Sequence, residues 1–145
     1  MMTKMSNKIK IGLVQTKVSS QTDTNLDKAS KYINEAAKKG ANIICLQELF
    51  AMRYFAQREN NEAFALAETI PGKITHFLSE QAKKNEITLI GGSIFEKGEN
   101  GNYYNTSLIF DERGNQIGKY RKIHIPYDRY YYEQHYFSSG NLGYV

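Results

Sequence analysis

Short apolar blocks alternate with longer amphipathic ones along the chain, and their two periods predict strands and helices in turn. Residues 8–16 (KIKIGLVQT) begin with strict polar–apolar alternation and end in an apolar run, which predicts a buried strand. Residues 42–47 are apolar and flanked by turns, as expected of a strand covered on both faces. Residues 87–95, 103–110 and 116–125 predict three more strands, separated by turns rich in glycine, asparagine and aspartate.

Two segments between the strands repeat apolar residues at helical spacing. Thr24 followed by Asp27 resembles a capping box at the start of the first helix, and residues 38–40 (KKG) predict its end. Residues 71–72 (PG) precede the second helix, and Asn85 lies at its end. The apolar positions are Leu26, Ala29, Ile33, Ala36 and Ala37 in the first helix and Ile74, Phe77, Leu78 and Ala82 in the second.

The order of these elements predicts an α/β fold. The first half reads β-α-β-α-β and the later part is hairpin-like, which indicates a layered domain with a mixed sheet rather than a purely parallel one. The 145 residues suit one modest domain with a core of its own. The sequence contains no internal repeat, low-complexity tract or linker.

Composition and charge narrow the class of protein. The chain is 41% hydrophobic and 23% charged, as ordinary globular domains are. No apolar stretch approaches the roughly 18 residues of a membrane span, and the first residues lack the apolar centre of a signal peptide. The single cysteine excludes an internal disulfide framework and a multi-cysteine metal site, and it fits a reducing, cytoplasmic setting. The net charge of +4 comes largely from scattered lysines, which argues against nucleic-acid binding.

Glu48 is the first candidate for chemistry. It follows the apolar run 43–46, so it lies just beyond the carboxyl end of a predicted buried strand, where active groups of α/β sheets collect. A carboxylate at the mouth of such a strand is partly desolvated and suited to proton transfer. A helix N-terminal cap or a salt-bridge partner is the structural alternative.

Lys122 lies in the string KYRKIHIP (119–126). Alternation along the predicted strand places Tyr120, Lys122 and His124 on one face. The lysine then either extends its ammonium group to the sheet edge or points it into a pocket. A phosphate site would need further basic residues on that face or a glycine-rich loop before a helix, and the sequence has neither. Paired with Glu48, the ammonium group suits the stabilisation of a developing oxyanion.

Four strings of the sequence carry a family resemblance. They are ICLQELF (44–50), LAETIPG (66–72), YYNTSLIFDERGNQIGKYRKIHIP (103–126) and YYEQHYFSSGNLG (131–143). They resemble the nitrilase superfamily of carbon–nitrogen hydrolases and, within it, the N-carbamoylputrescine amidase branch. The resemblance runs in order from about Lys8 to the last residue. It implies that the chain is the N-terminal part of an α-β-β-α sandwich with a mixed sheet.

The resemblance also implies a mechanism and its residues. Family members hydrolyse non-peptide carbon–nitrogen bonds with a glutamate, a lysine and a nucleophilic cysteine, and they need no metal or cofactor. Glu48 then matches the general base, Lys122 the cation that stabilises the oxyanion, and Glu133 a second glutamate that positions the lysine. A surface-loop acid is the alternative for Glu133. Tyr54 is a candidate for lining the substrate pocket, with a core or surface tyrosine as the alternative.

The nucleophile of the family follows the lysine by a few dozen residues, whereas this chain ends at Val145. Cys45 lies inside the apolar strand before Glu48, where a cysteine is normally a small buried hydrophobe and not a reactive thiolate. We therefore expect residues 1–145 to be the N-terminal portion of a single hydrolase domain, truncated before its nucleophile and inactive alone. An uncovered sheet face that favours association is expected as well.

The substrate implied by the resemblance is a small molecule with an N-carbamoyl amine, such as N-carbamoylputrescine in polyamine biosynthesis. Its hydrolysis through a thiol-bound carbamoyl group would release amine, carbon dioxide and ammonia. A related ureido or amide hydrolase and a non-catalytic scaffold or interaction module are the alternatives. The stretch 127–130 (YDRY) departs from the acidic pair and proline–glycine turn of the carbamoylputrescine branch, which leaves the exact amine open.

The expected partners are the small-molecule substrate and further copies of the chain in a homo-oligomer, with neither nucleic acid nor a membrane among them. The tyrosines at 130–132 lie beside Arg129 and suit loop packing or an oligomer interface, because no basic stripe extends them into a nucleic-acid site.

Overall fold

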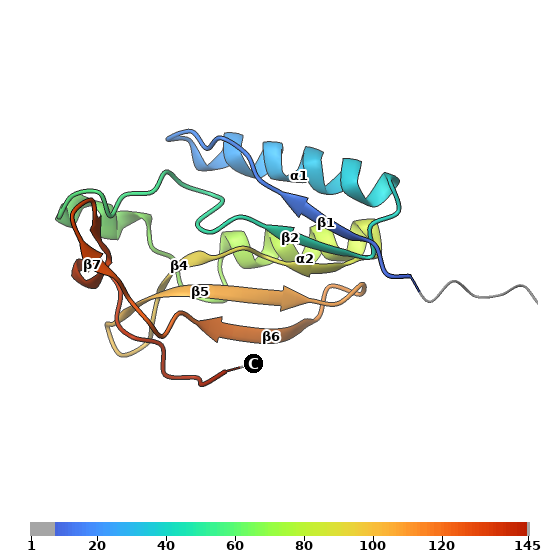
Figure 1. Ribbon diagram of the computed structural model, residues 1–145. Coiled ribbons are helices and arrows are strands. Elements are labelled where there is room, and N and C mark those ends of the chain that lie inside the picture. The colour runs from blue at the N-terminus through green and yellow to red at the C-terminus, as the bar shows by residue number, and fades with distance from the viewer. Residues whose placement is uncertain (1–7, 145) are drawn as a thin grey trace, which may run out of the picture.

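The computed structural model describes residues 8–144, which form one six-stranded mixed sheet and a small hairpin (Figure 1). The strands of the sheet are β1 (Ile11–Val14), β2 (Ile43–Leu46), β3 (Thr88–Ile90), β4 (Ile94–Lys97), β5 (Tyr103–Phe110) and β6 (Gln116–Arg121). β1, β2 and β3 run parallel, and β5 is antiparallel to β3, β4 and β6. Both β3 and β4 pair with one edge of β5 and β6 pairs with the other, so the mixed sheet that the sequence predicts is confirmed.

Two helices, α1 (Thr22–Lys38) and α2 (Lys73–Asn85), pack against each other and against the strands (Figure 1). α1 ends before Gly40, whose φ of 84° is the left-handed conformation expected after a helix end. The capping box predicted from Thr24 and Asp27 is wrong, because α1 already begins at Thr22 and its N-cap residue Gln21 makes no side-chain capping bond. The bounds of α2 agree with the sequence pattern.

The core lies between the helices and the face of the sheet that they cover. Ile33 of α1 and Leu78 of α2 are fully buried, as are Ile44, Leu89 and Leu108 of the strands. Burying one such side chain stabilises the fold by about 1.5 to 3 kcal/mol. The amphipathic pattern of both helices is therefore explained by this single core.

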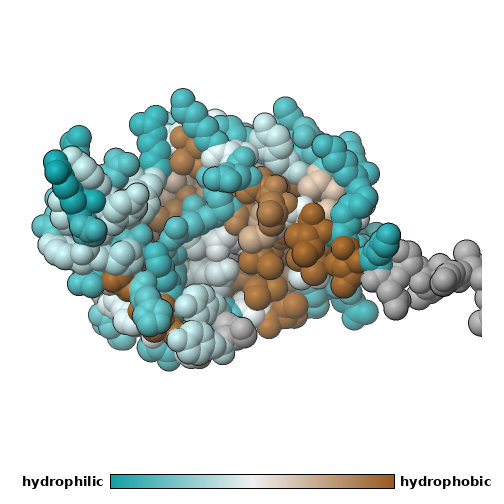
Figure 2. Space-filling model, in the orientation of Figure 1, coloured by the Kyte–Doolittle hydropathy of each residue, from teal (hydrophilic) through white to brown (hydrophobic). Residues whose placement is uncertain are grey.

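The opposite face of the sheet is open. On the edge strand β1, Ile11 is 62% and Leu13 is 81% exposed, and their register partners Ile43 and Cys45 on β2 are half-buried. Figure 2 shows hydrophobic side chains gathered over this part of the molecule. The prediction of a buried strand at 8–16 is wrong for this face, because no described element covers β1 from that side.

The predicted strand 8–16 is longer than β1, and two further predicted strands have different bounds in the structure. The apolar segment 87–95 is divided into β3 and β4 by a short irregular stretch, residues 91–93. Gly91 begins this break, and a Cβ there would lie 2.4 Å from a methyl group of Leu78. The segment 116–125 leaves the sheet after Arg121, so its last four residues form a loop.

The remaining elements pack at the end of the sheet where β2 and β4 meet the long loops. They are the short helices η1 (Asn61–Leu66) and η2 (Glu133–His135) and the hairpin of β7 (Tyr127–Asp128) and β8 (Tyr131–Tyr132). Rings of Phe55, Phe64, Phe95, Tyr136 and Phe137 contact one another here, with several centroid distances of 4.8 to 5.8 Å. This aromatic cluster fixes the segment around Tyr54 and the segment around Glu133 on the sheet.

A buried ion cluster joins β4 to β6. Glu96 is 3% exposed and accepts hydrogen bonds from Lys119 Nζ at 2.6 Å, from Arg121 Nη2 at 2.6 Å, and from the hydroxyl of Thr106. The guanidinium of Arg121 also lies 3.9 Å from the ring centroid of Tyr104. Burial by itself would raise the pKa of Glu96, but the hydrogen bonds from Arg121, Lys119 and Thr106 outweigh it and lower the pKa to about 2.

Candidate active site

A sharp turn after β2 positions Glu48. The chain turns through Leu49, whose φ of 47° lies in the left-handed region, and the main-chain N–H of Leu49 donates to Ser93 Oγ at 2.9 Å. This bond ties the turn to the stretch between β3 and β4. Gly92 in that stretch has a φ of 51°, and a Cβ there would lie 2.0 Å from the carbonyl oxygen of Gln47. The turn that carries Glu48 therefore needs glycine at position 92.

The substitution Gly92→Ala is expected to lower the free energy of unfolding by about 3 kcal/mol, because it adds a backbone collision to the strain of a positive φ. Gly101→Ala is the matched control: its φ is 78°, but nothing lies within 4 Å of the added Cβ. That variant is expected to lose only about 1 kcal/mol. Urea unfolding followed by circular dichroism measures both, and equal losses would contradict the role of the close approach.

The main chain fixes Lys122 directly after β6. Its N–H donates to the carbonyl oxygen of Asn105 at 2.9 Å, and its own carbonyl oxygen accepts from the N–H of Gly140 at 2.9 Å. The sequence predicted Lys122 within a strand. In the structure it lies just beyond the strand end at Arg121. Its side chain still points to the face of the sheet that carries Tyr120, in agreement with the predicted alternation.

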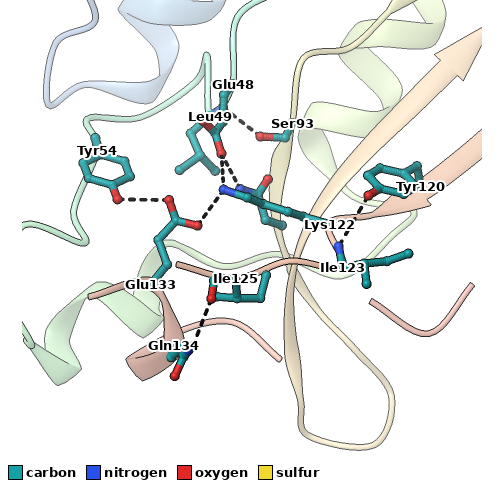
Figure 3. A network of polar contacts seen from close by, with 11 residues as sticks. Glu48, Leu49, Tyr54, Ser93, Tyr120, Lys122, Ile123, Ile125, Glu133 and Gln134 are labelled. Carbon is teal, nitrogen blue, oxygen red and sulfur yellow. Dashed lines mark hydrogen bonds and ion pairs between the residues drawn. The ribbon is translucent and has the colours of Figure 1, made fainter. Parts of the chain in front are cut away.

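The ammonium group of Lys122 lies between two carboxylates (Figure 3). Its Nζ is 3.3 Å from Glu48 Oε1 and 2.7 Å from Glu133 Oε2. The structure thus brings together the three residues that the sequence singled out, although 74 residues separate Glu48 from Lys122. The exposed fraction is 52% for the Glu48 side chain but only 4% for that of Glu133. Glu48, for which the sequence predicted partial desolvation, is therefore half-exposed, and Glu133 is the more strongly desolvated of the two carboxylates.

Tyr54 holds the second oxygen of Glu133. Its hydroxyl donates to Glu133 Oε1 at 3.0 Å (Figure 3). Its ring is tilted against that of Tyr131 at a centroid distance of 6.1 Å. Burial and the hydrogen bond to Glu133 raise the pKa of the Tyr54 hydroxyl above its ordinary value, so this group stays a donor at neutral pH. The predicted contact of Tyr54 with a substrate stays a prediction.

The charges of the cluster favour a protonated lysine. Burial by itself would lower the pKa of Lys122, but the hydrogen bond to Glu133 and the negative charge of Glu48 outweigh it and raise the pKa. An ammonium group has three N–H donors, and two of them face Glu133 and Glu48. Within residues 8–144 the third donor has no partner, so it can bind an oxygen of a ligand.

Asn105 is a site residue that the sequence reading missed. It lies on β5 with an exposed fraction of 3%, and its Nδ2 donates to Glu48 Oε1 at 2.7 Å. Asparagine is depleted in strands, so one inside the predicted strand 103–110 was a signal of a specific role. Its partner lies 57 residues away, which no local pattern can reveal.

Cys45 lies closer to this site than the sequence suggested. It is half-buried on the open face of the sheet and lines a hollow of about 310 Å³ together with Glu48 and Lys122. Its thiol donates to the carbonyl oxygen of Leu46 at 3.4 Å, and burial raises its pKa. A thiol with a raised pKa is a poor nucleophile at neutral pH, in keeping with a packing role.

Other classes of site are not found in the part of the chain that the structure describes. Residues 8–144 contain no group of three His, Cys, Asp or Glu side chains arranged to hold a metal ion. No helix among these residues is long and apolar enough to cross a membrane.

Comparison with curated proteins shows what the sequence is similar to. The chain is 36% identical over 138 residues to the N-carbamoylputrescine amidase of Oryza sativa subsp. japonica, a match that covers 95% of this chain and 46% of the relative. It is 43% identical over 122 residues to the omega-amidase NIT2-B of Xenopus laevis, which covers 81% of this chain and 41% of the relative. The chain thus spans about half the length of the curated relatives it matches.

Solved structures and a family model support the same relationship to carbon–nitrogen hydrolases. A carbon–nitrogen hydrolase from Helicobacter pylori G27 superposes with a TM-score of 0.87 at 36% identity, over 93% of this chain and 46% of the other. Nit3 of Saccharomyces cerevisiae, a member of branch 10 of the nitrilase superfamily, superposes with a TM-score of 0.77 at 32% identity, over 92% and 49%. The carbon–nitrogen hydrolase family model matches residues 10–145. The chain therefore belongs to the carbon–nitrogen hydrolase family.

Proposed function

We propose that residues 1–145 form the N-terminal portion of a domain that hydrolyses a non-peptide carbon–nitrogen bond. In this proposal Glu48 is the general base, Lys122 stabilises the oxyanion, and Glu133 positions Lys122. The nucleophile is a cysteine of a longer protein in which the sequence continues beyond residue 145. Cys45 has only a packing role.

The arrangement of donors and acceptors around Lys122 is the observation that supports these roles. One N–H of the ammonium group is unpaired within residues 8–144. Glu48 Oε2 accepts no hydrogen bond from these residues, since Asn105 and Lys122 both donate to Oε1. A free acceptor beside a free cationic donor is what thiol attack on a carbonyl group requires. A purely structural ion cluster, such as the one around Glu96, would leave its carboxylate fully paired.

The reaction follows from these two groups. Glu48 accepts the proton of the attacking thiol while its sulfur forms a bond to the carbonyl carbon, and Lys122 stabilises the negative charge on the carbonyl oxygen. The protonated Glu48 then donates to the leaving nitrogen as the carbon–nitrogen bond breaks. Glu48 then deprotonates a water whose oxygen forms a bond to the carbonyl carbon, the carbon–sulfur bond breaks, and Glu48 returns the proton to the sulfur. An acyl group leaves as a carboxylic acid, and a carbamoyl group leaves as carbamic acid, which decomposes to carbon dioxide and ammonia.

An N-carbamoyl amine such as N-carbamoylputrescine is the proposed substrate, supported by the similarity to the N-carbamoylputrescine amidases of Oryza sativa and Solanum lycopersicum. An ω-amide is the second candidate, because the omega-amidases match with higher identity over a shorter part of the chain. Both candidates use the same attack on a carbonyl carbon, and they differ in the group that leaves.

Ammonia release from N-carbamoylputrescine and from an ω-amide tests the proposal. The 145-residue chain is expected to release no ammonia from either substrate. The longer protein with its downstream cysteine is expected to hydrolyse N-carbamoylputrescine faster than the ω-amide. Cys45→Ala is expected to leave that activity unchanged. Turnover by the short chain that disappears in Cys45→Ala would show that Cys45 is the nucleophile and would overturn the assignment.

A further inference from the structure

Asn105 contacts both of the charged groups that the proposed reaction uses. Its side-chain Nδ2 donates to Glu48 Oε1 at 2.7 Å, and its main-chain carbonyl oxygen accepts from the N–H of Lys122 at 2.9 Å. It lies in the middle of the sheet, since β5 is paired on both edges, and it is opposite Phe95 of β4. A rigid strand therefore fixes the distance between the base and the cation.

We propose that Asn105 is a positioning residue that selects which oxygen of Glu48 takes part in proton transfer. Oε1 accepts two hydrogen bonds, from Asn105 and from Lys122, whereas Oε2 accepts none within residues 8–144. The amide thus turns the carboxylate so that Oε2 is the oxygen presented to an incoming thiol. This inference rests on the proposed function of Glu48.

Glu48 needs such a partner because little else holds it. It stands on a turn, its side chain is 52% exposed, and its contact with Lys122 is 3.3 Å long. Lys122 is closer to Glu133, at 2.7 Å, and so does not orient Glu48 firmly by itself. Within residues 8–144 the side chain of Glu48 makes two contacts, and the bond from Asn105 is the shorter, which indicates that Asn105 is the main determinant of its orientation.

A neutral amide is the chemically suitable group at this position. It donates to the charged carboxylate without adding a charge, so the pairing of Lys122 with Glu48 and Glu133 is undisturbed. A second carboxylate in its place would accept rather than donate and would repel Glu48. Alanine would leave the carboxylate free to rotate while keeping both charges in the site.

Steady-state kinetics of the longer protein test the proposal. Asn105→Ala is expected to lower kcat about 10- to 100-fold with KM changed less than about twofold, because the bond lost orients the base and does not contact the substrate. Thr106→Ala is the stability control. Thr106 is the adjacent fully buried residue on β5, and its hydroxyl donates to Glu96 instead of Glu48. Rates are expressed per folded protein, with the folded fraction taken from circular dichroism.

The nearly isosteric Asn105→Asp separates positioning from packing. Its carboxyl group becomes a donor only when protonated. The titratable groups that line the same hollow are Cys45, Glu48, Tyr120 and Lys122, and Glu133 is bound to Lys122. Its activity relative to that of the unsubstituted protein is expected to rise as the pH is lowered from 8 to about 5.5. A purely structural role would give a ratio that does not depend on pH.

The outcomes distinguish the two proposals. A normal kcat in Asn105→Ala, or a pH-independent activity ratio for Asn105→Asp, would overturn the role of Asn105. The proposed function would still hold in that case if Glu48→Gln is inactive. Full turnover in Glu48→Gln would overturn the proposed function itself. A loss of kcat in Thr106→Ala equal to that in Asn105→Ala would assign the effect to the strand and contradict positioning.

Discussion

In the longer protein, Glu48→Gln and Lys122→Ala are each expected to reduce turnover by at least about 100-fold, to below detection. Glutamine keeps the shape of Glu48 but cannot accept the thiol proton, and general-base catalysis of this kind typically contributes about 10²- to 10⁴-fold. Alanine removes the cation from the oxyanion, a loss of about 10²- to 10³-fold for comparable donors. Because the two groups act in one step, the double variant is expected to be hardly slower than either single variant.

Stability has to be separated from chemistry in this experiment. Lys122→Ala leaves the carboxylate of Glu133, whose side chain is 4% exposed, without its cation, so part of the protein unfolds. Activity is therefore compared at equal folded fraction. Glu80→Gln and Lys84→Ala, which change exposed residues of α2, are the charge-matched controls and are expected to be fully active. A Lys122→Ala variant with more than about a tenth of normal turnover would contradict the assignment.

The second large effect is expected at Glu96. Glu96→Gln removes the negative charge from beneath Lys119 and Arg121, and breaking a buried pair of this kind costs about 3 to 5 kcal/mol. Urea unfolding is expected to show this loss. Glu112→Gln, which changes an exposed glutamate in the turn after β5, is expected to alter the free energy of unfolding by less than about 0.5 kcal/mol.

The pH dependence of stability provides an independent check. The pKa of Glu96 is about 2 in the folded protein, below the ordinary glutamate value of 4.5. A lowered pKa contributes stability that is fully present above pH 4.5 and is lost as the pH falls from 4.5 toward 2. The stability of Glu96→Gln is therefore expected to fall less steeply in that window. Parallel curves for the two proteins would contradict the assignment.

The sequence predicted the parts of the fold in which local pattern and packing agree. α2 and β5 have the predicted bounds, because turn residues end the apolar pattern at the same positions as the structure does. The open face of β1 was not predictable, since alternation shows that two faces differ but not which of them is covered. The break between β3 and β4 was hidden for a similar reason, as apolar residues continue on both sides of Gly91 and Gly92.

The sequence singled out the charged residues of the candidate site and Tyr54, but not Asn105 or Ser93. Glu48 and Lys122 stand out because a charge at the end of an apolar strand needs an explanation, and the family resemblance added Glu133. Ser93 carries no such contrast along the sequence, and Asn105 stands out only as an asparagine within a predicted strand, with no sign of its partner. Their roles arise only where β5 and the stretch between β3 and β4 approach the turn after β2, and tertiary structure alone decides that approach.

The long separations within the site determine when it forms during folding. The bonds from Lys122 to Glu48 and from Tyr54 to Glu133 close loops of 74 and 79 residues. The entropy of loop closure opposes contacts between residues so far apart in the sequence, until pairings between nearer residues have brought the two segments together. We therefore expect Lys122 to reach Glu48 only after β6 has paired with β5, and β5 with β3. The base and the cation are then among the last groups to meet, and a substitution that slows pairing of the β5–β6 hairpin is expected to delay formation of the whole site.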